Sequence, residues 1–66
     1  MKITLNGKER NITATADLQS LIGQFCRDPQ HVIAEHNGII VKNHEWTKCI
    51  LKDGDALELV NFVGGG

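Results

Sequence analysis

The residues with the clearest chemical potential are the last three, Gly64, Gly65 and Gly66. Glycine in an ordered element costs about 0.5–1 kcal/mol relative to alanine and adds no apolar surface, so packing does not explain a run of three. Fully extended, three residues reach at most about 10 Å, which is enough to enter the active site of another protein. The carboxylate of Gly66 becomes electrophilic only when one oxygen is made a leaving group, for example in an acyl-adenylate formed from ATP. We therefore interpret Gly66 as the substrate of a partner enzyme; the alternative is a frayed end or an expression scar.

Two cysteines and two aspartates are weaker candidates. Cys26 and Cys49 lie far apart, with no CxxC pattern. Their even number allows a disulfide, but a reducing compartment favours two free thiols, with Cys26 acting as a small hydrophobic residue. Asp53 and Asp55 enclose Gly54 ahead of a strand pattern, which is typical of a turn and not of an acid/base pair.

The three histidines do not form a predicted metal site. His31 and His36 are five residues apart in a predicted strand, so their side chains should leave opposite faces, and His44 lies in a different turn. The sequence also has no P-loop lysine, no GxSxG motif and no nucleophile with an evident base. We expect neither a bound metal nor an enzyme.

Length and charge favour a module that acts through partners. The chain has 66 residues, and a domain of this size buries only about 60% of its unfolded surface, which leaves little core around an enclosed pocket. Seven Lys and Arg balance eight Asp and Glu without a basic run, which disfavours a nucleic-acid partner. No stretch reaches the roughly 20 apolar residues of a membrane span, and the N-terminus does not read as a signal peptide. We expect no membrane partner and a cytoplasmic location.

The first half of the chain predicts a hairpin followed by a helix. Apolar and polar residues alternate over residues 1–5, Asn6-Gly7 favours a tight turn, and residues 8–13 read as an edge strand protected by charge. Asp17 is placed to cap a helix that should stop at Asp28-Pro29. Its apolar stripe is Leu18, Leu21, Ile22 and Phe25. Gly23 lies inside this helix, and we interpret it as a point of close approach by a strand.

The second half predicts short strands around small turns. Residues 32–34 and 39–41 flank Asn37-Gly38, residues 43–46 should form one helical turn with Trp46 against the core edge, and residues 52–55 should form a polar turn.

The last strand should run from residue 56 to residue 62 or 63. If Leu57 and Leu59 face the helix, Val60 and Phe62 face outward just before the glycines and form a docking patch. The alternative is that Phe62 folds over a core edge.

These elements predict an α+β fold, with one main helix crossing a mixed sheet and the last strand beside the first. We expect a single domain over residues 1–66, with residues 63–66 as a flexible tail.

The combination resembles a known family. The hairpin, the helix ending near Pro29, the turn from Lys52 to Asp55, the apolar last strand and Gly65-Gly66 look like the ubiquitin-like β-grasp sulfur carriers. The ending Val60-Asn61-Phe62-Val63-Gly64-Gly65-Gly66 is most similar to the ThiS family, the sulfur carriers of thiamine biosynthesis. The resemblance covers essentially the whole chain.

The resemblance implies a mechanism. An E1-like enzyme of the ThiF type would use Mg-ATP to adenylate Gly66, and sulfur passed on by a cysteine desulfurase would displace AMP to leave a thiocarboxylate. A ThiG-like thiazole synthase would then take that sulfur into thiazole. Gly64 and Gly65 would thread into the partner's active site, while Val60, Phe62 and Val63 would bind the partner. The chain itself would bind no cofactor.

Three alternatives remain open from the sequence. The chain could be a carrier for another pathway, such as the small subunit of molybdopterin synthase or a carrier for cysteine biosynthesis. It could be a ubiquitin-like modifier joined to lysines through Gly66. It could also be a plain β-grasp interaction domain with an incidental tail.

Overall fold

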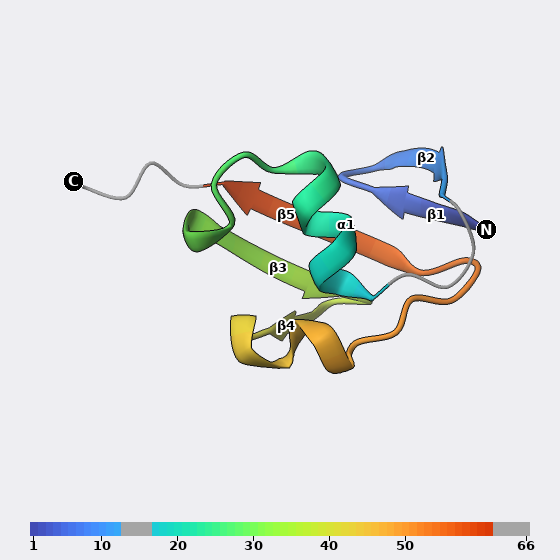
Figure 1. Cartoon of the computed structure of the whole chain (residues 1–66). Coiled ribbons are helices and arrows are strands. Elements are labelled where there is room, and N and C mark those ends of the chain that lie inside the picture. The colour runs from blue at the N-terminus through green and yellow to red at the C-terminus, as the bar shows by residue number, and fades with distance from the viewer. Residues whose placement is uncertain (13–16, 62–66) are drawn as a thin grey trace.

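One helix packs across one face of a mixed five-stranded sheet (Figure 1). The computed structural model describes residues 1–12 and 17–61. Across the sheet the strand order is β2-β1-β5-β3-β4. In chain order the elements are β1 (Lys2–Leu5), β2 (Lys8–Asn11), α1 (Leu18–Phe25), the 3-10 helix η1 (Pro29–His31), β3 (Val32–His36), β4 (Ile39–Val41), the 3-10 helix η2 (Asn43–Lys48) and β5 (Ala56–Asn61). The predicted α+β, β-grasp fold class is confirmed.

Both Asn-Gly pairs form the hairpin turns that the sequence predicts. Asn6 and Gly7 have φ values of 51° and 82°, and Asn37 and Gly38 have values of 52° and 86°. Positive φ at both central residues is the geometry of a type I′ turn, which matches the twist of the flanking strands. The first turn joins β1 to β2, whose four residues are all exposed at the sheet edge, and the second joins β3 to β4.

The last strand occupies the middle of the sheet. β5 runs parallel to β1, with Thr4 opposite Ala56, and antiparallel to β3 from Val32 opposite Asn61 to His36 opposite Leu57. The predicted pairing of the first and last strands is therefore confirmed. Because β5 has a neighbour on each side, its backbone is fixed more firmly than that of an edge strand.

The core lies between α1 and the inner face of the sheet. Of the residues that the structure describes, eleven apolar ones are buried there: Ile3, Leu5, Leu18, Leu21, Ile22, Val32, Ala34, Trp46, Leu51, Leu57 and Leu59. Trp46 is 5% exposed, and its indole N–H donates to the carbonyl oxygen of Val41 at 2.9 Å, so this aromatic residue closes the core beside β4. At the start of α1, Asp17 accepts a hydrogen bond from the Ser20 amide at 2.7 Å and caps the helix as predicted.

Three predictions about the helix region are wrong. α1 ends at Phe25, before Asp28-Pro29, because the backbone is already extended at Cys26. The buried stripe consequently stops at Ile22, and the Phe25 side chain is 42% exposed. Among the described residues, no atom outside the chain neighbours of Gly23 and the backbone of α1 lies within 4 Å of the position that a Cβ on Gly23 would take, so no described strand approaches it closely.

Candidate functional site

Only one residue of the predicted site lies within the described part of the chain. Val60 is near the end of β5, and its side chain is 55% exposed. Phe62, Val63 and the glycines of residues 64–66 lie outside the described residues. The structure therefore shows how β5, the strand that precedes the predicted reactive end, is held in the sheet and which side chains it exposes.

The two faces of β5 are used differently, as the alternation of residues predicts. Leu57 and Leu59 are buried under α1, while Val60 points to the open face of the sheet. Ile33 of β3 lies directly opposite Val60 and is 44% exposed. Residues opposite each other on neighbouring strands have adjacent side chains, so Val60 and Ile33 form an exposed apolar pair, which we call the Val60–Ile33 pair. Sequence reasoning missed Ile33 because the register between β3 and β5 was not evident.

Asn6 holds the end of β5. Its amide oxygen accepts from the Leu59 N–H at 2.8 Å, and its amide nitrogen donates to the Leu59 carbonyl oxygen at 3.3 Å. The backbone N–H of Asn6 also donates to the Leu57 carbonyl at 2.9 Å. Where β1 turns away, the Asn6 side chain therefore replaces the backbone partner that one further strand residue would supply.

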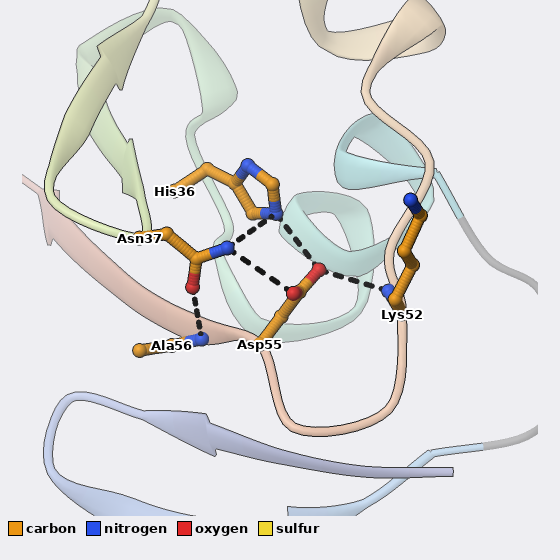
Figure 2. A network of polar contacts seen from close by, with 5 residues as sticks. All are labelled: His36, Asn37, Lys52, Asp55 and Ala56. Atoms are coloured by element: carbon orange, nitrogen blue, oxygen red, sulfur yellow. Dashed lines mark hydrogen bonds and ion pairs between the residues drawn. The ribbon is translucent and has the colours of Figure 1, made fainter.

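Asn37 holds the start of the same strand from the other side. Its amide oxygen accepts from the Ala56 N–H at 2.8 Å, and its amide nitrogen donates to Asp55 Oδ1 at 3.2 Å (Figure 2). The backbone N–H of Asn37 donates to the Ala56 carbonyl at 2.8 Å. Each Asn-Gly turn thus places its asparagine side chain on β5.

Asp55 is the centre of the network at the start of β5. It is the one buried charged or polar residue of the described ranges, at 8% exposure. Its Oδ2 accepts from the Lys52 N–H at 2.8 Å and lies 2.8 Å from Nε2 of His36 (Figure 2). An ionised carboxylate can only accept, so Nε2 of His36 carries the proton that makes this bond. The network joins the β3–β4 hairpin to the turn before β5.

The ionisation of Asp55 follows from these contacts. Burial alone would raise the pKa of its carboxyl group, but the hydrogen bonds from His36, the Lys52 amide and Asn37 outweigh burial and lower the pKa. Asp55 is therefore negatively charged at neutral pH.

The turn before β5 also binds β1. The Asp53 carboxylate accepts from the Lys2 N–H at 2.7 Å, Gly54 N–H donates to the Lys2 carbonyl at 2.7 Å, and Thr4 N–H donates to the Asp55 carbonyl at 2.9 Å. Gly54 has a φ of 89°, which suits glycine. The prediction of a turn at Asp53-Gly54-Asp55 is correct, but the burial and the partners of Asp55 were not foreseen.

The histidines and cysteines form no evident reactive group. His31 lies in η1 and not in a strand, so the predicted strand placement is wrong for it, and its Nδ1 lies 2.6 Å from the Asp28 carboxylate. Within residues 1–12 and 17–61, no group of three His, Cys, Asp or Glu side chains could hold a metal ion. Cys26 and Cys49 are free thiols, as predicted, and burial raises the pKa of both. A raised pKa keeps them in the less reactive thiol form.

No helix in the described segments has the length and apolar character needed to cross a bilayer.

Comparison with known proteins agrees with this fold. Residues 3–66 match the model of the ThiS family. The sulfur carrier protein ThiS of Bacillus subtilis is 34% identical over 97% of this chain and 98% of its own length. The crystal structure of the thiamine biosynthesis protein (ThiS) from Geobacter metallireducens covers the whole of both chains, with 29% identity and a TM-score of 0.86.

Longer relatives also match. A thiazole synthase of Paramagnetospirillum magneticum is 39% identical over this whole chain, and one of Magnetococcus marinus is 35% identical. This chain spans about 20% of the length of either protein. With a family model that matches residues 3–66, and a relative of similar length, the chain belongs to the ThiS family.

Proposed function

We propose that this chain is a sulfur carrier of thiamine biosynthesis and that its reactive group is the carboxylate of Gly66. The observation that carries the proposal is the match to the ThiS family over residues 3–66, which includes the terminal glycines. The similar length of the Bacillus subtilis sulfur carrier protein ThiS supports it.

The chemistry that we propose uses a partner enzyme of the E1-like, ThiF type. A carboxylate oxygen of Gly66 attacks the α-phosphate of Mg-ATP, pyrophosphate leaves, and an acyl-adenylate remains. A cysteine desulfurase holds the sulfur that it takes from cysteine as a persulfide, whose terminal sulfur then attacks the acyl carbon, and AMP leaves with the bonding electron pair. A thiol next attacks the other sulfur of the resulting acyl disulfide, forms a new disulfide with it and releases the acyl-bound sulfur with the S–S electron pair. The product is a thiocarboxylate at Gly66. Its sulfur is a better nucleophile than the oxygen that it replaces.

We propose a ThiG-like thiazole synthase as the acceptor of that sulfur. The support is that two proteins named thiazole synthase each contain a segment that matches this entire chain and makes up about a fifth of their length. A sulfur-carrier segment on the same polypeptide as a thiazole synthase would stay close to that acceptor, which raises the effective concentration of the carrier.

The scaffold would present the reactive end and a docking surface on one strand. β5 is hydrogen-bonded on both sides up to Leu59, so its direction is fixed relative to the rest of the domain. Val60 would contact the partner together with Ile33, and Phe62 and Val63 would extend this contact. A small apolar patch suits moderate affinity, which a carrier needs in order to leave each enzyme.

Gly64 and Gly65 would pass through the narrow entrance of the partner's active site, where any side chain would obstruct. In this proposal the chain is a carrier and a substrate, not an enzyme. ATP and Mg²⁺ would be bound by the partner, with no cofactor on this chain, and the reaction would take place in the cytoplasm.

Intact mass spectrometry tests the proposal directly. The whole chain is incubated with Mg-ATP, a ThiF-like enzyme and a sulfide source. We expect a mass gain that matches the exchange of one oxygen for one sulfur, and no gain after deletion of Gly66. A variant with Gly38→Asn, altered only in a turn distant from the tail in sequence, should still gain the mass. Covalent conjugates with other proteins, in place of a free thiocarboxylate, would contradict the proposal and indicate a protein modifier.

A further inference from the structure

A hollow with basic sides opens on the helix side of the sheet. It has a volume of about 540 Å³ and lies between the C-terminal end of α1 and strands β2, β1 and β5. Lys8, Arg10 and Arg27 line it, and all three are exposed. Its apolar lining includes Leu5, Phe25 and Leu59. We call these six residues the basic hollow.

The positive charge of the basic hollow is not neutralised from within the described ranges. None of its lining residues is acidic, and none of its three cations has a carboxylate within ion-pair distance there. Glu9 lies between two of them in sequence but is opposite Thr4 and so points to the other face of the sheet. Asp28 follows Arg27, but its carboxylate is paired with His31. A chain with a formal net charge of −1 thus concentrates three of its seven Lys and Arg residues here.

The helix end and the aromatic ring at the basic hollow offset only part of its positive charge. The C-terminal end of a helix carries about −0.5 of an elementary charge, and α1 has no basic residue in its last turn. Arg10 lies over the ring of Phe25, with its guanidinium carbon 5.4 Å from the ring centre, which is a cation–π contact. This contact positions the guanidinium group but does not neutralise it. About two and a half positive charges therefore remain around an apolar floor.

The lining also indicates the class of ligand. Phosphate sites are typically built from consecutive backbone N–H groups or a helix N-terminus, and this hollow has the C-terminal end of a helix instead. Long cationic side chains around Leu5, Phe25 and Leu59 instead suit carboxylate side chains that flank an apolar one. We propose that the basic hollow binds an acidic segment of a partner protein, in which an apolar side chain enters the hollow between Asp or Glu residues.

This surface is distinct from the Val60–Ile33 pair. Leu59 and Val60 are neighbours on β5, so their side chains point to opposite faces of the sheet. A partner could therefore occupy the basic hollow while the open face of the sheet is engaged. Binding at the basic hollow does not depend on the chemistry proposed for Gly66, because it uses only the charge and shape of the helix side of the sheet.

The test is an NMR titration of the whole ¹⁵N-labelled chain. The probe is a capped synthetic peptide with two glutamates on each side of one leucine; the same peptide with glutamine in place of glutamate and inorganic phosphate are the comparison ligands. We expect saturable amide shifts at Lys8, Arg10 and Arg27 with the acidic peptide alone, weakened by added salt because the charges are exposed. Absence of these shifts, or shifts centred elsewhere, would overturn the proposal. Equal binding by phosphate would overturn it in favour of a small-anion site.

Matched variants separate this site from general attraction between charges. The double variant Arg10→Gln and Arg27→Gln should weaken peptide binding about fivefold, since each exposed charge pair contributes modestly. Lys42→Gln with Lys48→Gln removes the same charge elsewhere and should leave the affinity within about twofold. Lys8→Gln leaves the Arg10 contact with Phe25 intact and should still weaken binding, which guards against a packing defect. Equal losses in both double variants would overturn the proposal.

Discussion

The two Asn-Gly turns have the same backbone geometry but hold β5 in different ways. Asn6 binds the backbone of Leu59 through both atoms of its amide, and no charged side chain takes part. Asn37 binds the backbone of Ala56 and also the carboxylate of Asp55, which in turn binds His36. One strand is thus held near its end by a neutral contact and at its start by an ionic network.

This contrast indicates that the two ends of β5 contribute differently to the stability of this small domain. At the start of β5, one buried carboxylate joins the β3–β4 hairpin, the preceding turn and the strand, so its loss would disconnect three segments. At the end of β5, the contact with Asn6 fixes only the local direction of the strand. We therefore expect substitutions at the start to affect global unfolding and substitutions at the end to affect local opening.

The largest effect should follow Asp55→Ala. The change leaves the Lys52 N–H, His36 and Asn37 without their shared acceptor, and we expect a loss of about 3 kcal/mol in the free energy of unfolding. Denaturant unfolding followed by Trp46 fluorescence measures it. Asp53→Ala is the matched control: its single bond to the Lys2 N–H is exposed, so the loss should stay below about 1 kcal/mol. Similar losses in both variants would show that Asp55 has no special role.

The two asparagines should differ when each is replaced by glycine. Glycine tolerates the positive φ, so only the side-chain contacts are lost. Asn37→Gly should cost about 2 kcal/mol globally, because Asp55 also loses a donor. Asn6→Gly should cost about 1 kcal/mol.

Hydrogen exchange would locate these two effects. In Asn6→Gly, the Leu59 amide should exchange about fivefold faster while the β3 amides change less. Uniformly faster exchange in both variants would contradict the proposed division between the two ends of β5.

The turns were predictable from the sequence, whereas their second role was not. Asn-Gly between alternating residues specifies a type I′ hairpin from local backbone preference alone. Asn6 and Leu59 are separated by 53 positions in the sequence, and Asn37 and Asp55 by 18. Both contacts depend on which strands become neighbours. Local patterns hold no information about that choice.

The same distinction between local patterns and long-range contacts explains which predictions about the core are correct and which are wrong. The pattern of Leu57 and Leu59 correctly placed them under the helix, because alternation in a strand is a local property. Phe25 matches the helical period of the buried residues, but it is the last residue of α1 and its side chain is exposed. The sequence predicts an ordinary turn residue at Asp55, because the contact with His36 that accompanies its burial comes from the β3–β4 hairpin and cannot be seen in the local pattern.

Acid should affect the start of β5 more than its end. The folded-state pKa of Asp55 is lowered below the unfolded value of about 3.9, so its contribution is complete above that value and is lost as the pH falls through the lower folded pKa. Asp55→Asn should therefore flatten the acid limb of a plot of unfolding free energy against pH. Asn6→Gly removes no titrating group and should keep the shape of the wild-type curve at lower stability. An unchanged acid limb in Asp55→Asn would contradict the assignment.

The smallest effect on stability should come from the outward side of β5. Val60→Thr keeps a β-branched side chain in the strand, and Val60 is 55% exposed, so the free energy of unfolding should change by less than about 0.5 kcal/mol. If Val60 is a docking residue, the same variant should bind a ThiF-like enzyme several-fold more weakly, because a hydroxyl replaces a methyl group at a desolvated contact. Ile39→Thr, at a side chain that is 70% exposed in the β3–β4 hairpin, is the matched control and should bind as the wild type does. Both variants remove one apolar contact from an equally folded domain, so their binding can be compared directly. Weaker binding by Ile39→Thr alone would indicate that the docking surface is the β3–β4 hairpin and not the end of β5.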